Sequence, residues 1–192
     1  MSLITHSGVN QSGASAGGNI AGRDVNNTTV VHAAPQAAGI VEQLLQKLSV
    51  EKDQDQHSLE RIERLQRFYI QRAHDGVNGL EAKLQHSGRE ESYLDAIEMK
   101  EMFAKLLEQW SLYSSAQKIF VYLLARAERH FNDFILPQIS ELNSVEVNQL
   151  MNQLIVEPTV QDCGASVFEI DHNVAMGMIY WLAEQCFVRW HK

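Results

Sequence analysis

The 192-residue sequence contains only two cysteines and three prolines. Two cysteines in a chain of this length do not form a disulfide framework, so we expect Cys163 and Cys186 to be free, buried thiols. The N-terminus lacks a basic stretch followed by an apolar one, which is the pattern of a secretory signal. These features together predict a protein of the reducing cytoplasm.

Basic side chains are also scarce. Lysine and arginine number 16 against 24 aspartates and glutamates, which gives a net charge of −8. Because binding to a phosphate backbone needs clustered basic residues, this composition predicts no direct nucleic-acid binding. The uncharged run from Val174 to Ala183 is shorter than the roughly 20 apolar residues that a bilayer-spanning helix needs. We therefore expect no membrane contact.

Motifs of metal binding and catalysis are missing as well. Neither cysteine has a recognisable catalytic signature, and no C-x-x-C pair supports a zinc site. Glu169 and His172 have the spacing of a di-iron ligand pair, but a site in a helical bundle needs a second such pair and two further glutamates. The sequence therefore predicts a protein without metal, cofactor or catalytic activity.

One catalytic alternative rests on Arg67 and His74, which are separated by six residues. This spacing resembles that of helical ribonucleases of the HEPN type, in which arginine and histidine side chains from two subunits converge on the scissile phosphate. Phe68 follows the arginine where that family usually has a polar residue. A surface helix with ordinary basic residues explains the pattern more simply.

The composition changes near Pro35 and divides the chain into residues 1–35 and 36–192. The first part is rich in Gly, Asn and Ser, which is typical of a flexible tail. Alternatively, it forms very short β-strands that become ordered only by pairing with copies of itself or with another protein, since such strands are not stable alone. Under this second interpretation, the self-association residues are Gly18, Asn19, Ile20, Gly22, Arg23, Asp24 and Val25.

The second part reads as an all-α bundle of about six helices, because apolar residues recur at intervals of three and four. The expected ranges are 38–49, 57–74 with a continuation to 86, 91–113, 115–136, 144–155, and a last helix that begins at 171 or 172. The range 115–136 is apolar on every side over IFVYLLA, as in a central helix. Ser144 is the expected N-cap of its helix. Residues 156–170 read as a loop in which VFEI forms a short strand.

The last helix is apolar nearly all round, so it must be buried in the core or against a partner. Trp181 and Trp190 fit either location. Tryptophan and arginine dominate interface energetics, so Trp181, Arg189 and Trp190 are the candidate partner-binding residues, with Arg189 as the exposed anchor.

The stretch GMIYWLAEQCFVRW resembles the closing signature of the C-terminal domain in bacterial ABC-three-component conflict systems, which act in anti-phage defence. The matching positions are Gly177, Met178, Tyr180, Trp181, Leu182, Cys186, Val188, Arg189 and Trp190. Phe187 stands where that signature has histidine, so any role of the histidine is absent. GGNIAGRDVNN is similar to a Gly/Asn motif that precedes domains in such proteins.

The resemblance implies a non-catalytic, protein-binding and self-associating component of an ATP-driven complex. Its implied partners are an ABC- or SMC-like ATPase and a small middle component. Two alternatives stay open at this point. One is the HEPN-like ribonuclease, and the other is a free-standing homo-oligomeric scaffold, for example of phage origin.

Overall fold

The computed structural model describes residues 39–58, 61–72 and 76–191. The Gly/Asn-rich segment 1–35, with its proposed strands and self-association residues, lies outside the described residues, and so does His74. The described part consists of helices and connecting turns and contains no strand. The predicted all-α class is therefore confirmed for the described residues.

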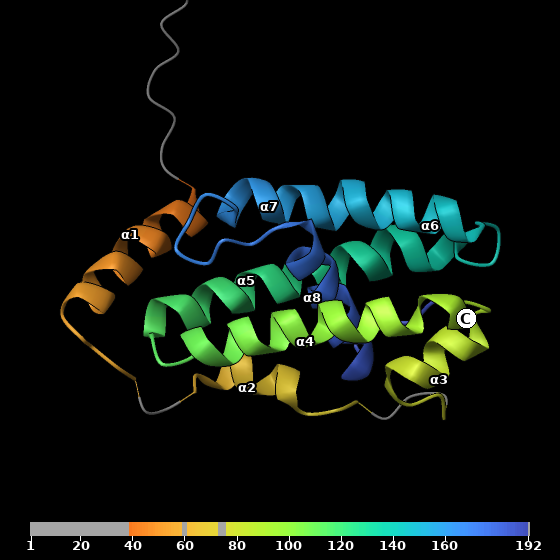
Figure 1. Ribbon diagram of the computed structural model, residues 1–192, viewed down its shortest axis with the longest axis horizontal. Helices are drawn as coiled ribbons and strands as arrows, with labels where there is room; N and C mark the ends of the chain where they lie inside the picture. The colour runs from red at the N-terminus through yellow and green to blue at the C-terminus, as the bar shows by residue number, and fades with distance from the viewer. Residues whose placement is uncertain (1–38, 59–60, 73–75, 192) are drawn as a thin grey trace, which may run out of the picture. The chain divides into compact units, whose positions relative to one another are not determined.

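The α-helices of the described part follow one another without an intervening sheet (Figure 1). Their bounds are α1 Ile40–Asp53, α2 Glu63–Tyr69, α3 Gly79–His86, α4 Tyr93–Trp110, α5 Ser114–His130, α6 Ser144–Met151, α7 Glu157–Cys163 and α8 His172–Glu184. Two 3-10 turns, Glu90–Ser92 and Leu136–Gln138, and two π-helical turns, Phe131–Ile135 and Asn152–Val156, extend or connect them. None of the described helices is long and apolar enough to cross a membrane.

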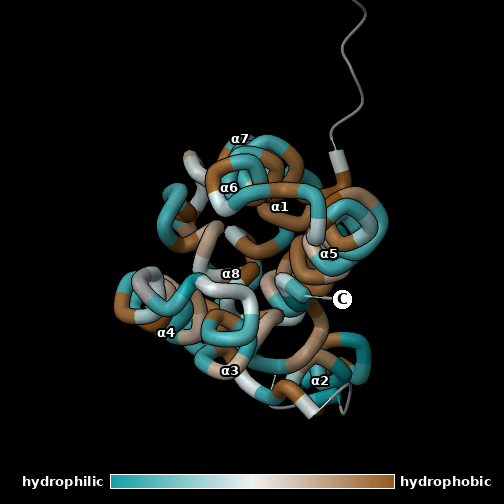
Figure 2. Tube along the Cα trace, turned by 90° about the vertical axis from the view of Figure 1, so that its right-hand side faces the viewer, coloured by the Kyte–Doolittle hydropathy of each residue, from teal (hydrophilic) through white to brown (hydrophobic). Residues whose placement is uncertain are grey.

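Helix α8 lies in the middle of this helical unit, with the other helices around it (Figure 2). Its residues from Gly177 to Ala183 are all buried, as the apolar run predicts. Asp171 caps its N-terminus by accepting a hydrogen bond from the Val174 amide at 2.8 Å. Helix α4 makes the most extensive contact with α8. Burial of α8 within the chain's own core is thus confirmed.

The region 144–163 differs from the sequence prediction. Residues 157–163 form α7 instead of a loop, and α6, the π-helical turn and α7 follow one another in line (Figure 1). Pro158 lies in the first turn of α7, where proline is tolerated and does not interrupt the helix. The N-cap of α6 is Asn143, not Ser144, because its side chain accepts hydrogen bonds from the Val145 and Glu146 amides.

Two further ranges are corrected. The helix expected over 57–74 is α2, which is confined to Glu63–Tyr69. The VFEI stretch is not a strand, although Phe168 and Ile170 are buried and Val167 and Glu169 are exposed as the alternation indicates. Glu169 has a φ of 50°, which takes the backbone out of the extended region.

Candidate functional site

The C-terminal segment, residues 185–191, turns back from the end of α8 and packs onto the helical unit. Cys186 has a φ of 61°, the Cys186 amide donates to the Ala183 carbonyl at 3.0 Å, and the Phe187 amide donates to Leu182 at 2.8 Å. This pair of bonds is the Schellman arrangement that ends a helix, with cysteine at the position where glycine is usual. The helix therefore stops at Glu184, and the chain end is a separate buried segment.

A buried lysine side chain donates hydrogen bonds to this turn. Lys83 of α3 is 2% exposed, and its Nζ donates to the Ala183 carbonyl at 2.5 Å and to Cys186 Sγ at 3.0 Å. A positive charge is favourable at the C-terminal end of a helix, where the carbonyl dipoles converge. In return, the Glu184 carboxylate accepts a hydrogen bond from the Leu80 amide at 2.7 Å, near the start of α3. The two contacts tie α3 to the end of α8.

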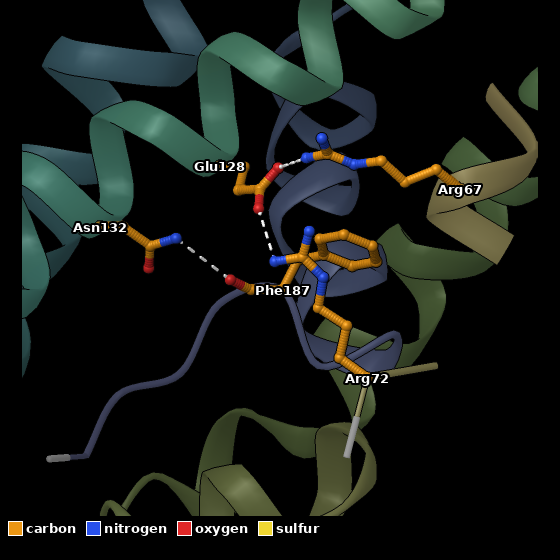
Figure 3. A network of polar contacts seen from close by, with 5 residues as sticks. All are labelled: Arg67, Arg72, Glu128, Asn132 and Phe187. Atoms are coloured by element: carbon orange, nitrogen blue, oxygen red, sulfur yellow. Dashed lines mark hydrogen bonds and ion pairs between the residues drawn. The ribbon is translucent and has the colours of Figure 1, made fainter. Parts of the chain in front are cut away.

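Two arginines share one carboxylate beside this segment (Figure 3). Arg67 Nη2 lies 2.5 Å and Arg72 Nη1 2.9 Å from the oxygens of Glu128 on α5. The Arg72 guanidinium also lies 4.1 Å from the centre of the Phe187 ring, and Asn132 donates to the Phe187 carbonyl at 3.3 Å. This network anchors the C-terminal segment to α5. Both arginines are paired with the single carboxylate of Glu128.

The three predicted partner-binding residues lie at different depths. Trp181 is 6% exposed and packs against Phe103 and Tyr69. Trp190 is 4% exposed and packs against Phe131 and Tyr180, while Arg189 is partly buried. Burial also raises the pKa of the Tyr180 phenol above its usual value. Direct contact of Trp190 with a partner would require the C-terminal segment to leave its place, and contact of Trp181 would require the side chains that bury it to move. The partner role of both residues stays a prediction.

The candidate catalytic and metal-binding residues are not brought together. Arg67 is held by Glu128, and His74 lies outside the described residues. Glu169 and His172 are both exposed. Within the described ranges, no three His, Cys, Asp or Glu side chains are placed to hold a metal ion. Cys163 and Cys186 are free and buried, as the sequence predicts.

Comparison with protein-family models gives a match over residues 79–190, which run from α3 to the C-terminal segment. The matching family is C-terminal domain 9 (CTD9) of the ABC-three component (ABC-3C) systems. The chain belongs to this family. The resemblance of the GMIYWLAEQCFVRW stretch is thereby confirmed. A search of curated proteins and a search of solved structures give no match to the chain.

The family signature at the end of this CTD9 chain has a structural explanation. Gly177 lies against the Met99 backbone of α4, Cys186 occupies the turn after α8, and Trp190 packs against the core. These positions hold the domain together. The exposed surface of the described unit offers further candidates for docking.

A hollow with a volume of about 840 Å³ is lined by residues of α1, α2 and α5. We call it the cationic groove; it is lined by Ile40, Gln43, Leu44, Lys47, Ile62, Arg64, Lys118, Val121, Tyr122, Ala125, Arg126, Arg129 and His130. Its lining residues were not among the predicted site residues. The available signal was spacing, since Lys118, Tyr122, Ala125 and Arg129 recur at intervals of three and four and therefore share one face of α5.

Proposed function

We propose that this chain is a non-catalytic docking component of an ABC-3C complex. It binds the ABC- or SMC-like ATPase or the small middle component, and it self-associates through residues 18–25. The observation that carries the proposal is the CTD9 match over residues 79–190. The role of the complex in anti-phage defence is the function that this membership favours.

The arrangement of charged groups supports a binding role over a catalytic one. The polar groups around the C-terminal segment make internal contacts: buried Lys83 with Cys186, and the more exposed Arg67 and Arg72 with Glu128. A ribonuclease of the HEPN type would need Arg67 directed at a phosphate, so its pair with Glu128 would have to be broken. Accessible positive charge is found instead around the cationic groove.

The proposal is tested by affinity purification of the tagged full chain from its native host, with the mass and composition of the particle determined. We expect an ABC-type ATPase and a small third protein to co-purify. Recovery of a homo-oligomer alone would favour the free-standing scaffold. Cleavage of RNA that is abolished by His74→Ala, with the fold intact, would favour the ribonuclease.

Self-association is tested with a matched pair of substitutions in the N-terminal segment. Ile20→Asp lies within the proposed self-association residues, whereas Val9→Asp lies outside them. We expect Ile20→Asp to lower the mass of the particle and Val9→Asp to leave it unchanged. Equal masses for both variants and the wild type would remove residues 18–25 from the proposal.

A further inference from the structure

The floor of the cationic groove is apolar and accessible. Ile40, at the start of α1, is 56% exposed, and Tyr122 of α5 is 36% exposed. Leu44, Val121 and Ala125 line the space between them. Its volume of about 840 Å³ lies within the range of about 300–1,000 Å³ that is usual for ligand sites. The groove is therefore large enough to receive the anchoring side chains of a peptide.

The rim of the groove carries positive charge. Five lysines and arginines line it (Lys47, Arg64, Lys118, Arg126 and Arg129), together with His130, and no aspartate or glutamate does. This contrasts with the net charge of −8 of the whole chain. A surface of this sign attracts acidic partners and repels basic ones.

Part of this charge is available for a ligand. Lys47 and Lys118 are exposed, and neither forms an ion pair with any of the residues that the structure describes. Arg129 pairs with Asp133, but the two side chains are 80% and 51% exposed, so the pair contributes little and is easily exchanged. Arg126 is less available, because its Nη1 lies 2.6 Å from Asp162 Oδ2 and both side chains are less exposed. Its guanidinium packs over the Tyr122 ring.

We propose that the cationic groove binds an acidic amphipathic helix of a partner protein, which inserts apolar side chains between α1 and α5 and places carboxylates against Lys47 and Lys118. This inference rests on the proposed function and names the chemistry of the partner. The walls are helices, whose backbone groups are already paired, so an added strand would find no free edge. A helix laid in a groove needs only side-chain contacts.

Charge and composition argue against other occupants. The first 38 residues of the chain contain one acidic side chain, Asp24, and thus do not supply the complementary charge. A single-stranded nucleic acid would be expected to stack its bases on several aromatic rings, whereas the floor offers one tyrosine among aliphatic side chains. The groove therefore fits an acidic peptide best.

The probe is a fluorescein-labelled peptide of about 18 residues, with leucines at intervals of three and four and glutamates on the flanking positions. Its binding to the full chain is measured by fluorescence anisotropy at low and high salt. Two groove variants, Lys118→Glu and Ile40→Asp, are compared with two matched variants outside the groove. These controls are Lys105→Glu and Leu94→Asp, which change exposed residues of α4.

We expect each groove variant to weaken peptide binding by on the order of tenfold, and the control variants to bind like the wild type. Binding should also weaken as salt rises, because exposed charges are screened. The inference is overturned if groove and control variants bind alike. It is also overturned if an RNA oligonucleotide of equal charge competes as strongly as the peptide, or if the groove variants only convert a dimer to a monomer.

Capture of the ATPase and middle component by the same variants separates this inference from the proposed function. If the wild type captures a component and Lys118→Glu does not, both stand. Equal capture by the wild type and both groove variants leaves the proposed function in place and refutes the groove as its site. When the wild type captures neither component, the proposed function fails, and the peptide measurement alone decides the groove.

Discussion

Gly177 of α8 lies directly against the backbone of Met99 in α4, where an added Cβ would be only 2.0 Å from the Met99 carbonyl oxygen. This close approach explains why glycine occupies the middle of the most buried helix. It also explains how α4 and α8 make the most extensive helix contact of the unit.

Gly177→Ala should therefore destabilise the protein, by about 1–3 kcal/mol of unfolding free energy, although alanine is the better helix former. The obstacle is backbone, which cannot rotate away as a side chain would. Chemical denaturation followed by circular dichroism measures the effect. Gly39→Ala is the control, because a Cβ there meets nothing within 4 Å. Equal stability of the two variants would contradict the close packing.

Lys83→Ala should cost about 2–4 kcal/mol, because it removes a buried stem and the ammonium that bonds Ala183 and Cys186. The matched control is Lys105→Ala, on the exposed face of α4, which should change stability by less than about 0.5 kcal/mol. The same denaturation experiment compares them. If the two substitutions had the same effect, the buried lysine would have no role in holding α3 to α8.

Glu128 and Arg72 should be energetically coupled, because their side chains lie 2.9 Å apart and Glu128 is mostly buried. A double-mutant cycle with Glu128→Ala and Arg72→Ala should give a coupling of about 1 kcal/mol. A parallel cycle with Arg129→Ala and Asp133→Ala, whose pair is much more exposed, should give less. Coupling that is no larger at Glu128 than at Asp133 would argue against the network as an anchor of the C-terminal segment.

Burial raises the pKa of the Cys163 thiol to about 12, with a smaller contribution from Asp162. The native thiol therefore stays protonated at pH 8–9 and should be alkylated far more slowly than in the unfolded chain, as peptide-resolved mass spectrometry can show. Above pH 9, the unfolded state loses this proton before the native state does, so stability should fall as pH rises from about 9 towards 12. The fall should be smaller in Cys163→Ala. Rapid native labelling of Cys163 would contradict its burial.

Much of the fold could be predicted because its longest helices carry clear periodicity. Helices α4, α5 and α8 follow the apolar spacing, and the run from Val174 to Ala183 indicated the buried centre. The features that the sequence did not predict depend on tertiary contacts. Glu169 and Cys186 have positive φ angles, which depend on tertiary packing. Neither residue type favours a positive φ, so the sequence does not predict this conformation. Pro158 is compatible with a helix start or a helix end, and only the structure decides between them.

The candidate site was harder to predict for a different reason. Tryptophans indicate either core or interface, and the structure places Trp181 and Trp190 in the core. The cationic groove combines α1 with α5, which are separated by some 60 residues of chain. The lysines of each helix, taken alone, do not indicate a binding site. They form a basic surface only because the two helices pack together.

Direct binding between purified components tests whether this chain is a docking component of its complex. The full chain is mixed with the ATPase and the middle component of its own system, and the masses are followed by size-exclusion chromatography with light scattering at about 10 µM, where an affinity near 1 µM is readily detected. We predict a peak whose mass is the sum of this chain and at least one component. Separate elution of all three proteins, with or without ATP, would contradict it.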